Sequence, residues 1–348
     1  MMRISGVILM NMHELKKLYM PEPVSREALL SHIQGLRFGV EIEFAGLTER
    51  EAAEKVFKAM GGHMYDRREK DNGDRFFDPF AVDKKRQFDV KINGMRYGFD
   101  RDTTINADKC AELVTSPMRL DKASDLMAAV HVLNQNGAYA TPTAATHIHL
   151  DASHEFDHNL NGFENPFLRI LCNSFVNRAA IGKMFPISAA RMKFCEPYSV
   201  LELMGMLHSQ PPELSAMDKT REIAVRNDYK TIELRRFAFD IDMLGPQIDF
   251  ALSLGSCSVL GVKLPPAYDE GVSERESVGV WLDYMGVPKA SIQKLGERLG
   301  EQLTTKQQAT GYMERYDSFS HGAEISKVRG LTNPKGIAYN EFRKGDIR

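Results

Sequence analysis

Hydrophobic and polar residues alternate along several short segments of this chain, as they do in β-strands with one buried face. The clearest segment is residues 39–44, in which three apolar side chains alternate with Glu41 and Glu43. At a strand rise of about 3.3 Å per residue, the two carboxylates stand roughly 7 Å apart on one side of a sheet. That spacing suits two hard cations, or one cation and a cationic substrate group. An ordinary strand with a wetted outer face has the same pattern.

Three later segments repeat this pattern and again place ionisable residues on one face of a predicted strand. The segments and their ionisable residues are 111–117 with Glu112, 146–151 with His147 and His149, and 230–237 with Glu233 and Arg235. A carboxylate inside a sheet-lined concavity is unfavourable unless it meets a cation. We therefore expect these faces to line one shared site.

Helical periodicity and end signals predict the remaining elements. Residues 48–51 form a capping box for a helix that runs to Met60, where Gly61 and Gly62 end it. Further helices are predicted at 13–19, 25–34 with Ser25 as N-cap, 121–136 with Asp121 as N-cap, 165–184, 198–208, 244–262, 277–285 and 289–303. Further extended segments are predicted at 89–92 and 95–97, joined by an Asn93-Gly94 turn, and at 99–105 and 221–227. A strand followed at once by a helix is typical of an α+β domain.

Composition narrows the classes of function. The net charge of -2 and the pI of about 6.6 give no general attraction to nucleic acid or membrane, so we expect neither as a partner. The four cysteines form no C-x-x-C pair, which argues against a zinc knuckle or a disulfide framework. No stretch approaches the ~20 apolar residues of a membrane span, and the start lacks the features of a signal peptide. These features predict a cytoplasmic protein.

The shared face has the ligand types of a divalent metal site. Several glutamates and a histidine suit Mg²⁺ or Mn²⁺, and imidazole is tolerated better by Mn²⁺. An arginine on the same face is what bidentate contact with phosphate needs. The chain has no Walker A, G-x-G-x-x-G or G-x-S-x-G motif. The pattern therefore indicates phosphoryl chemistry without a P-loop.

Six short motifs between residues 36 and 250 resemble, in content and order, those of the amidoligase family, which is similar to glutamine synthetase and glutamate-cysteine ligase. They are FGVEIEF at 38–44, DTTI at 102–105, ELVTSP at 112–117, HIH at 147–149, R-x-x-x-C-x-P at 191–197 and IELR at 232–235. The segment after Arg236 lacks the Gly-Thr element often seen in the family, which puts the substrate in doubt.

The resemblance implies an α+β fold, with a curved, mainly antiparallel sheet shaped as a half-funnel and helices on its outer face. ATP and two or three divalent cations would bind inside it. The metal ligands implied are Glu41, Glu43, Glu112, Glu233 and at least one of His147 and His149. Arg235 and Arg191 match phosphate-contacting arginines, and Asp102 and Thr104 match an element near the substrate. Glu41, Glu43, Arg235 and Arg191 are the expected catalytic residues.

The same resemblance implies a domain plan and a reaction. Residues 1–35 would be a helical lead-in, 36–262 the catalytic domain with 63–98 as an insert, and 263–348 a helical extension with a polar tail. The γ-phosphoryl group of ATP would pass to a substrate carboxylate, and an amine would attack the acyl phosphate. The acid and amine could each be small molecules or peptides. Ammonia or an amine would come from solution or from a partner, such as a separate amidotransferase or another pathway enzyme. Association into a homo-oligomer stays open.

Two alternative functions stay open beside the ligase. His154-Glu-Phe-Asp-His158 matches the H-E-x-x-H pattern of zinc metallohydrolases, which requires a helix to bring both histidines to one face. The following stretch is poor in helix formers, which argues against that reading. A degenerate binding module of the same fold is the second alternative, and the full set of charged positions argues against it.

Overall fold

The computed structural model describes residues 24–304, apart from 67–87, 103, 106, 153–164, 209–219, 227–229, 263, 265–266 and 268–273. Two sequence predictions, the helix at 13–19 and the H-E-x-x-H segment at 154–158, lie outside the described residues. So does the polar tail after Thr304.

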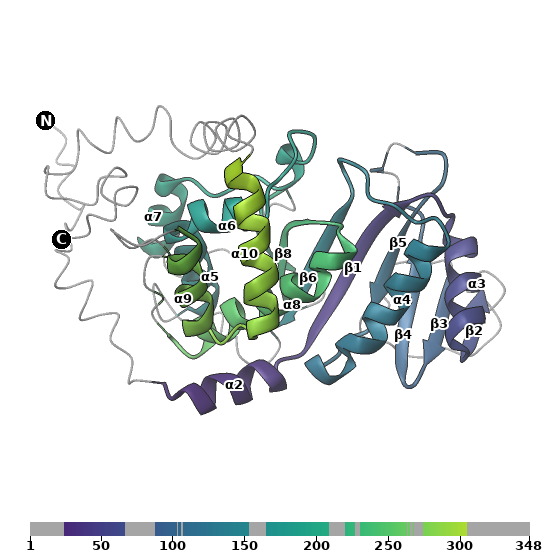
Figure 1. Ribbon diagram of the computed structural model, residues 1–348, viewed down its shortest axis with the longest axis horizontal. Helices are drawn as coiled ribbons and strands as arrows, with labels where there is room; N and C mark the ends of the chain where they lie inside the picture. The colour runs from purple at the N-terminus through teal and green to yellow at the C-terminus, as the bar shows by residue number, and fades with distance from the viewer. Residues whose placement is uncertain are drawn as a thin grey trace, which may run out of the picture.

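An eight-stranded sheet in the order β2-β3-β4-β5-β1-β6-β8-β7 forms the centre of the molecule (Figure 1). Every neighbouring pair is antiparallel. The strands are β1 (Phe38–Ala45), β2 (His63–Asp66), β3 (Phe88–Ile92), β4 (Met95–Asp100), β5 (Cys110–Thr115), β6 (Ala145–Asp151), β7 (Ile223–Arg226) and β8 (Thr231–Ala238). The strand that carries Glu41 and Glu43 therefore lies inside the sheet, with four strands on one side and three on the other.

Helices pack on one face of this sheet. They are α2 (Arg26–Gly35), α3 (Glu49–Met60), α4 (Ala123–Gln135), α5 (Pro166–Val176), α6 (Arg178–Met184), α7 (Val200–His208), α8 (Ile241–Val259), α9 (Glu274–Tyr284) and α10 (Lys289–Thr304). In Figure 1, α3, α4 and α8 lie across the strands, and α9 and α10 stand beside α8. The predicted fold class, an α+β arrangement with an antiparallel sheet and helices on its outer face, is confirmed.

The apolar residues of the alternating strands form the core under these helices. Ile42 and Phe44 are fully buried, as are Leu113 on β5 and Ile148 on β6. Because strand side chains alternate between faces, burying these residues against the helices turns the intervening charged residues to the opposite face. The hydrophobic pattern thus determines where the charged residues lie.

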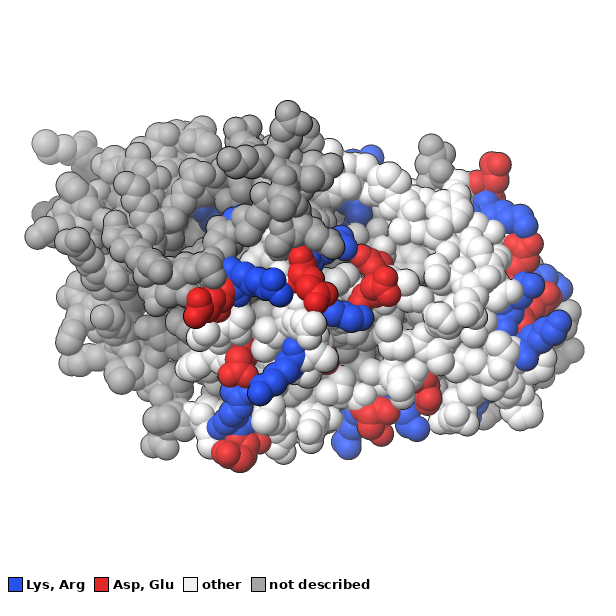
Figure 2. All heavy atoms as spheres, in the orientation of Figure 1, with Lys and Arg blue, Asp and Glu red and all other residues white. Residues whose placement is uncertain are grey.

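None of the helices in the described ranges is long and apolar enough to cross a membrane. Described acidic and basic side chains lie interspersed on the face shown in Figure 2, including the end of the molecule that carries α3. This mixture agrees with the near-neutral net charge.

The predicted capping box at the start of α3 is present. Thr48 Oγ1 accepts a hydrogen bond from the Glu51 amide at 3.3 Å, and the Glu51 carboxylate accepts one from the Thr48 amide at 2.9 Å. Replacing Thr48 with Ala is expected to lower the free energy of unfolding by about 1 kcal/mol, because one orphan helix amide loses its acceptor. Denaturant titration measures this change. Thr48→Ser keeps the acceptor and should match the wild type; equal losses in both variants would contradict the explanation.

Several element predictions need correction. Asp121 does not cap a helix: it lies in a 3-10 turn, Leu120–Lys122, and α4 begins at Ala123. The single helix predicted at 165–184 is two helices, because Asn177 leaves helical geometry and its side chain bonds to Asn173 and to the amide of Ala267. The Asn177 side chain thus connects this break to the segment after α8.

Two extended segments also differ from expectation. The extended stretch predicted to reach residue 105 ends at Asp100. Residues 63–66 form the short edge strand β2, where an irregular segment was predicted, because their pairing with β3 supplies hydrogen bonds that the local pattern does not show. The predicted turn between β3 and β4 is present, with positive φ at Asn93 and Gly94.

Candidate functional site

Strand register brings the predicted site residues together on the face opposite the helices. Glu43 lies directly across from Glu112 on β5, and Glu41 lies across from His147 on β6. His149 lies in turn across from Glu233 on β8. Directly opposed residues on neighbouring strands share a face and lie close together. Four strands that are far apart in sequence thus contribute to one cluster.

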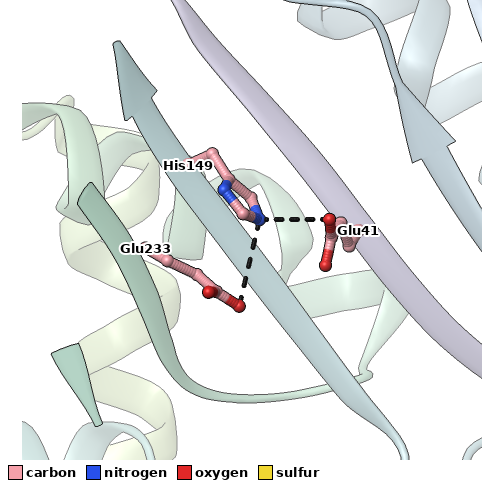
Figure 3. A group of neighbouring side chains, drawn as sticks. All are labelled: Glu41, His149 and Glu233. Carbon is pink, nitrogen blue, oxygen red and sulfur yellow. Dashed lines mark ion pairs between the residues drawn. The ribbon is translucent and has the colours of Figure 1, made fainter. Parts of the chain in front are cut away.

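The two histidines lie between carboxylates. His149 Nε2 is 3.3 Å from Glu41 Oε1 and 3.9 Å from Glu233 Oε1, as Figure 3 shows. His147 Nδ1 is 3.4 Å from Glu41 Oε2 and 3.3 Å from Glu233 Oε1. The other ring nitrogen of His149 is 3.0 Å from the hydroxyl of Thr231, which fixes the orientation of the imidazole.

Two sets of three side chains have the spacing of a metal site. Glu41, His149 and Glu233 make one set, and Glu41, Glu112 and His147 make the other. Within each set, one ligand atom per residue lies within 4.8 Å of the others. Carboxylate oxygens with one imidazole nitrogen suit Mn²⁺ and are compatible with Mg²⁺. Glu41 belongs to both sets, which makes it the centre of the cluster.

The carboxylates of the cluster differ in the direction in which their pKa is shifted. Burial alone raises the pKa of Glu41, but the neighbouring His149 and His147 outweigh burial and hold that pKa well below its usual value. Burial and the carboxylates of Glu41 and Glu43 raise the pKa of Glu112 well above its usual value. As pH falls, Glu112 therefore takes up a proton before Glu41 does, which reduces the repulsion between adjacent carboxylates.

The remaining two glutamates also differ from each other. Burial raises the pKa of Glu233, but His149 and His147 reverse this and leave the pKa lowered. Burial raises the pKa of Glu43, and the nearby Asp102 adds to the increase. Glu43 Oε2 accepts a hydrogen bond from the Ala145 amide at 2.8 Å, so its position is fixed by the backbone of β6.

Two arginines contact Glu233. Arg235, predicted from sequence, pairs with Glu233 Oε1, and Arg226 on β7 lies 3.1 Å from Glu233 Oε2. Arg226 was not predicted as a site residue, although it lies on the site face of β7, two residues after Ala224, which is directly across from Glu233. The two guanidinium groups place positive charge at the β7–β8 side of the cluster.

A bulge in β8 follows Arg235 in the chain. Thr146 pairs with Phe237 and Ile148 pairs with Leu234, so two residues of β8 oppose the single residue His147. Such a bulge interrupts the ladder and re-aims side chains. Arg235 keeps the face of Glu233 by ordinary alternation, and Arg236 lies on the helix face, where it pairs with the buried Glu222. The bulge brings the next residue, Phe237, to the helix face as well, against Phe250 of α8.

Arg191 bonds to the backbone at this same bulge. Its guanidinium donates to the carbonyl oxygens of Phe237 at 2.5 Å and Arg235 at 2.7 Å, and its side chain is buried. A bulged strand has carbonyl groups that its ladder does not satisfy. Both terminal nitrogens of Arg191 thus support β8; the phosphate contact expected of Arg191 stays a prediction.

Asp102 and Thr104 lie in the turn after β4. Asp102 Oδ1 accepts hydrogen bonds from the Thr104 amide at 2.6 Å and the Thr104 hydroxyl at 2.7 Å. The Asp102 charge contributes to the raised pKa of Glu43 and Glu112, which places the turn near the cluster. Asp100, directly opposite Glu112, is a further buried carboxylate that sequence reasoning missed. The sequence could have indicated Asp100, because it lies on the same face of the strand as Gly98 and Arg96.

Comparison with known proteins gives a family match and, among the solved structures, a distant match. A family model described as putative amidoligase enzyme matches residues 34–242. A crystal structure of the complex between the prokaryotic ubiquitin-like protein Pup and its ligase PafA matches with 12% sequence identity and a TM-score of 0.35, over 92% of this chain and 77% of that chain. A search of curated proteins found no match.

Proposed function

The chain belongs to the amidoligase family, and from this premise we propose that it is an ATP-dependent carboxylate-amine ligase that works with divalent metal ions. The observation that carries the proposal is the cluster in which two sets of three metal-ligand side chains share Glu41. The family match covers the strands that carry this cluster. The acidic strand pattern and the family match therefore fall in the same part of the chain.

We assign the metal ligands to Glu41, Glu43, Glu112, His147, His149 and Glu233. The donor set fits Mg²⁺ or Mn²⁺, because it is rich in carboxylate oxygens and the two histidines supply imidazole nitrogen. When bound, such ions would neutralise the charge of ATP phosphates and of the transferring group. The buried carboxylates of the cluster would then have the cations that their burial requires.

In the proposed reaction, a substrate carboxylate oxygen attacks the γ-phosphorus of ATP and ADP leaves. The amine nitrogen then attacks the acyl carbon, phosphate leaves, and the amine gives up a proton. Arg235 and Arg226 would donate to phosphate oxygens, and their pairing with Glu233 would orient them. Arg191 contributes by fixing the backbone of Arg235, in addition to any contact of its own. Asp102 and Thr104 would form the substrate-side edge.

We expect ADP and phosphate as the nucleotide products. Incubating the purified protein with ATP, Mg²⁺ and a panel of carboxylic acids, amino acids and amines tests this, with ADP release and product mass followed together. A ligase gives one condensation product per ADP. Detection of AMP and pyrophosphate would mean adenylation and would contradict the acyl-phosphate route. ADP without a condensation product in the presence of every acid and amine would leave only an ATPase.

A further inference from the structure

Thr231, the first residue of β8, contacts one ring nitrogen of His149. Its hydroxyl oxygen lies 3.0 Å from His149 Nδ1, and both residues are buried. Thr231 pairs with Asp151 on β6 and with Arg226 on β7, so neighbouring strands fix its backbone on both sides. Because His149 pairs with Glu233, two residues further along β8, Thr231 and His149 are diagonal neighbours on the site face. The contact therefore follows from the register of the strands.

The side chain of Thr231 has little freedom to leave this contact. Threonine is branched at Cβ, which restricts its χ1 angle in a strand. The carbonyl of the preceding residue, Lys230, accepts a hydrogen bond from the Ala152 amide at 2.9 Å, so the start of β8 is anchored to the end of β6. A hydroxyl held in this way fixes the orientation of the imidazole ring that it contacts.

The contact also bears on which nitrogen of His149 is available to a metal ion. A neutral imidazole carries its proton on one nitrogen and a lone pair on the other. As Figure 3 shows, Nε2 faces the carboxylates, at 3.3 Å from Glu41 Oε1 and 3.9 Å from Glu233 Oε1. Nδ1 faces the Thr231 hydroxyl instead. When that oxygen accepts a hydrogen bond from Nδ1–H, the lone pair lies on Nε2, beside the other two members of its set of metal-ligand side chains.

The ring of His147 is held differently. Its Nδ1 lies 3.4 Å from Glu41 Oε2 and 3.3 Å from Glu233 Oε1, and its Nε2 lies 3.7 Å from Glu43 Oε1. Both nitrogens thus face carboxylates that the proposed function assigns as metal ligands. A carboxylate that turns to a metal ion no longer orients the ring in the same way. The contact of His149 with the Thr231 hydroxyl, by contrast, is one that metal binding leaves in place.

We propose that Thr231 is a positioning residue of the metal centre. It keeps the proton of the neutral His149 ring on Nδ1 and so keeps Nε2 available as a ligand beside Glu41 and Glu233. This inference rests on the proposed function, because it concerns the metal ions of the ligase. Loss of such a partner behind a ligating histidine typically lowers metal affinity by about 10–100-fold.

Titration of the full chain with Mn²⁺ alone tests the inference. Thr231→Val keeps the branched shape and the strand preference of threonine but has no hydroxyl. We expect it to weaken Mn²⁺ binding by about tenfold or more, and Thr231→Ala to show the same loss. Thr231→Ser keeps a hydroxyl and should retain most of the wild-type affinity.

Thr146→Val is the matched control for these variants. Thr146 is also a buried threonine inside the sheet, but it pairs with the buried Ile42 and lies on the helix face. Its substitution should leave the Mn²⁺ affinity at the wild-type value. Unchanged Mn²⁺ affinity in Thr231→Val, or an equal loss in Thr146→Val, would overturn the inference.

A double-mutant cycle on Mn²⁺ affinity shows whether Thr231 acts through His149. In a His149→Gln background, Thr231→Val should cause no further loss, because the side chain that Thr231 orients is gone. In a His147→Gln background, the loss caused by Thr231→Val should persist. A full loss in the His149→Gln background would mean that Thr231 acts on the cluster by another route, and would reject the positioning role.

The same titrations separate this inference from the proposed function. Mn²⁺ binding that depends on Thr231, in a protein that forms no ADP, would reject the ligase function alone. ADP formation by a wild type whose Mn²⁺ affinity does not depend on Thr231 would reject the positioning role alone. Absence of Mn²⁺ binding to the wild type would reject the metal centre and the positioning role together.

Discussion

Glu41→Gln is expected to lose metal-dependent ATP turnover by about 100-fold or more, in a protein that still folds. Glu41 is the one residue that belongs to both sets of metal-ligand side chains in the described ranges, so both lose a ligand together. In other enzymes, removing one group that stabilises the charge developing in the transition state lowers the rate by about 10²–10³-fold. Glutamine keeps the shape of glutamate but is a much weaker metal ligand. The measurements are ADP release and Mn²⁺ titration on the same preparation.

Glu51→Gln is the matched control for this variant. Glu51 is also an ionised side chain with partners, Lys109 and Thr48, but it lies at the start of α3 and not in the cluster. It should keep wild-type turnover and metal affinity. The circular dichroism spectrum of Glu41→Gln should match that of the wild type, because Glu233 still contacts His147 at 3.3 Å and lies 3.9 Å from His149. Wild-type turnover in folded Glu41→Gln would reject the metal-centre assignment.

Metal affinity is expected to rise with pH, because the cluster without metal holds protons that coordination must displace. Glu112 holds one, since burial and the adjacent carboxylates raise its pKa. Burial lowers the pKa of His149, but Glu41 and Glu233 outweigh burial and leave that pKa raised, so the imidazole is a second candidate. Each displaced proton changes the apparent affinity by up to about tenfold per pH unit. Titrations with Mn²⁺ at pH 6, 7 and 8 measure how steeply the logarithm of the metal affinity rises with pH.

Glu112→Gln identifies the source of one proton. The substitution removes the titrating carboxyl group, so the number of protons released per bound metal ion should fall by one. The affinity at each pH should also be lower, because a metal ligand is lost. Titration in buffers of different ionisation enthalpy counts the released protons directly. A metal affinity that does not change between pH 6 and 8 would contradict the prediction.

The same shifts fix how removing metal affects stability. Glu112 and His149 have raised pKa values in the folded, metal-free protein. They therefore stabilise the fold fully at pH values below their pKa in the unfolded chain, 4.5 and 6.5, and this stabilisation is lost as the pH rises through their pKa in the folded protein. Glu41 and Glu233 have lowered pKa values, so their contribution is present above 4.5 and is lost as pH falls. Adding a chelator should therefore lower the melting temperature more at pH 8 than at pH 6.

Local patterns predicted the parts of the fold that depend on nearest neighbours. The period of two in residues 39–44 identified β1 and its two faces, and the Thr48 and Glu51 pair identified the start of α3. The turn at Asn93 and Gly94 was equally clear, because few residues tolerate positive φ. Each of these signals lies within a few residues of the structure that it predicts.

Features that depend on pairing between distant strands could not be read from the chain. Nothing near Arg235 shows that β8 bulges opposite His147, because the bulge exists only relative to β6. The same holds for the contact between Arg226 and Glu233, and for the bonds of Arg191 to the backbone of β8. The cluster was predictable as a set of residues, whereas the contacts that hold its arginines in place were not.

The bulge in β8 has a counterpart beside β1, where the two residues between Phe38 and Glu41 face the three residues between Val114 and Met118. At both bulges the strands pair on either side of the irregularity. If β8 lost Arg236, Arg235 would oppose His147, and the pairs of Leu234 with Ile148 and Phe237 with Thr146 could remain. A one-residue deletion within 115–117 would likewise let the ladder close between Val114 and Met118. Insertions and deletions at these two points would therefore alter the lining of the site while the rest of the sheet keeps its pairing. Between related chains, a difference of one residue in length at either point would therefore mark a change in the side chains that face the site.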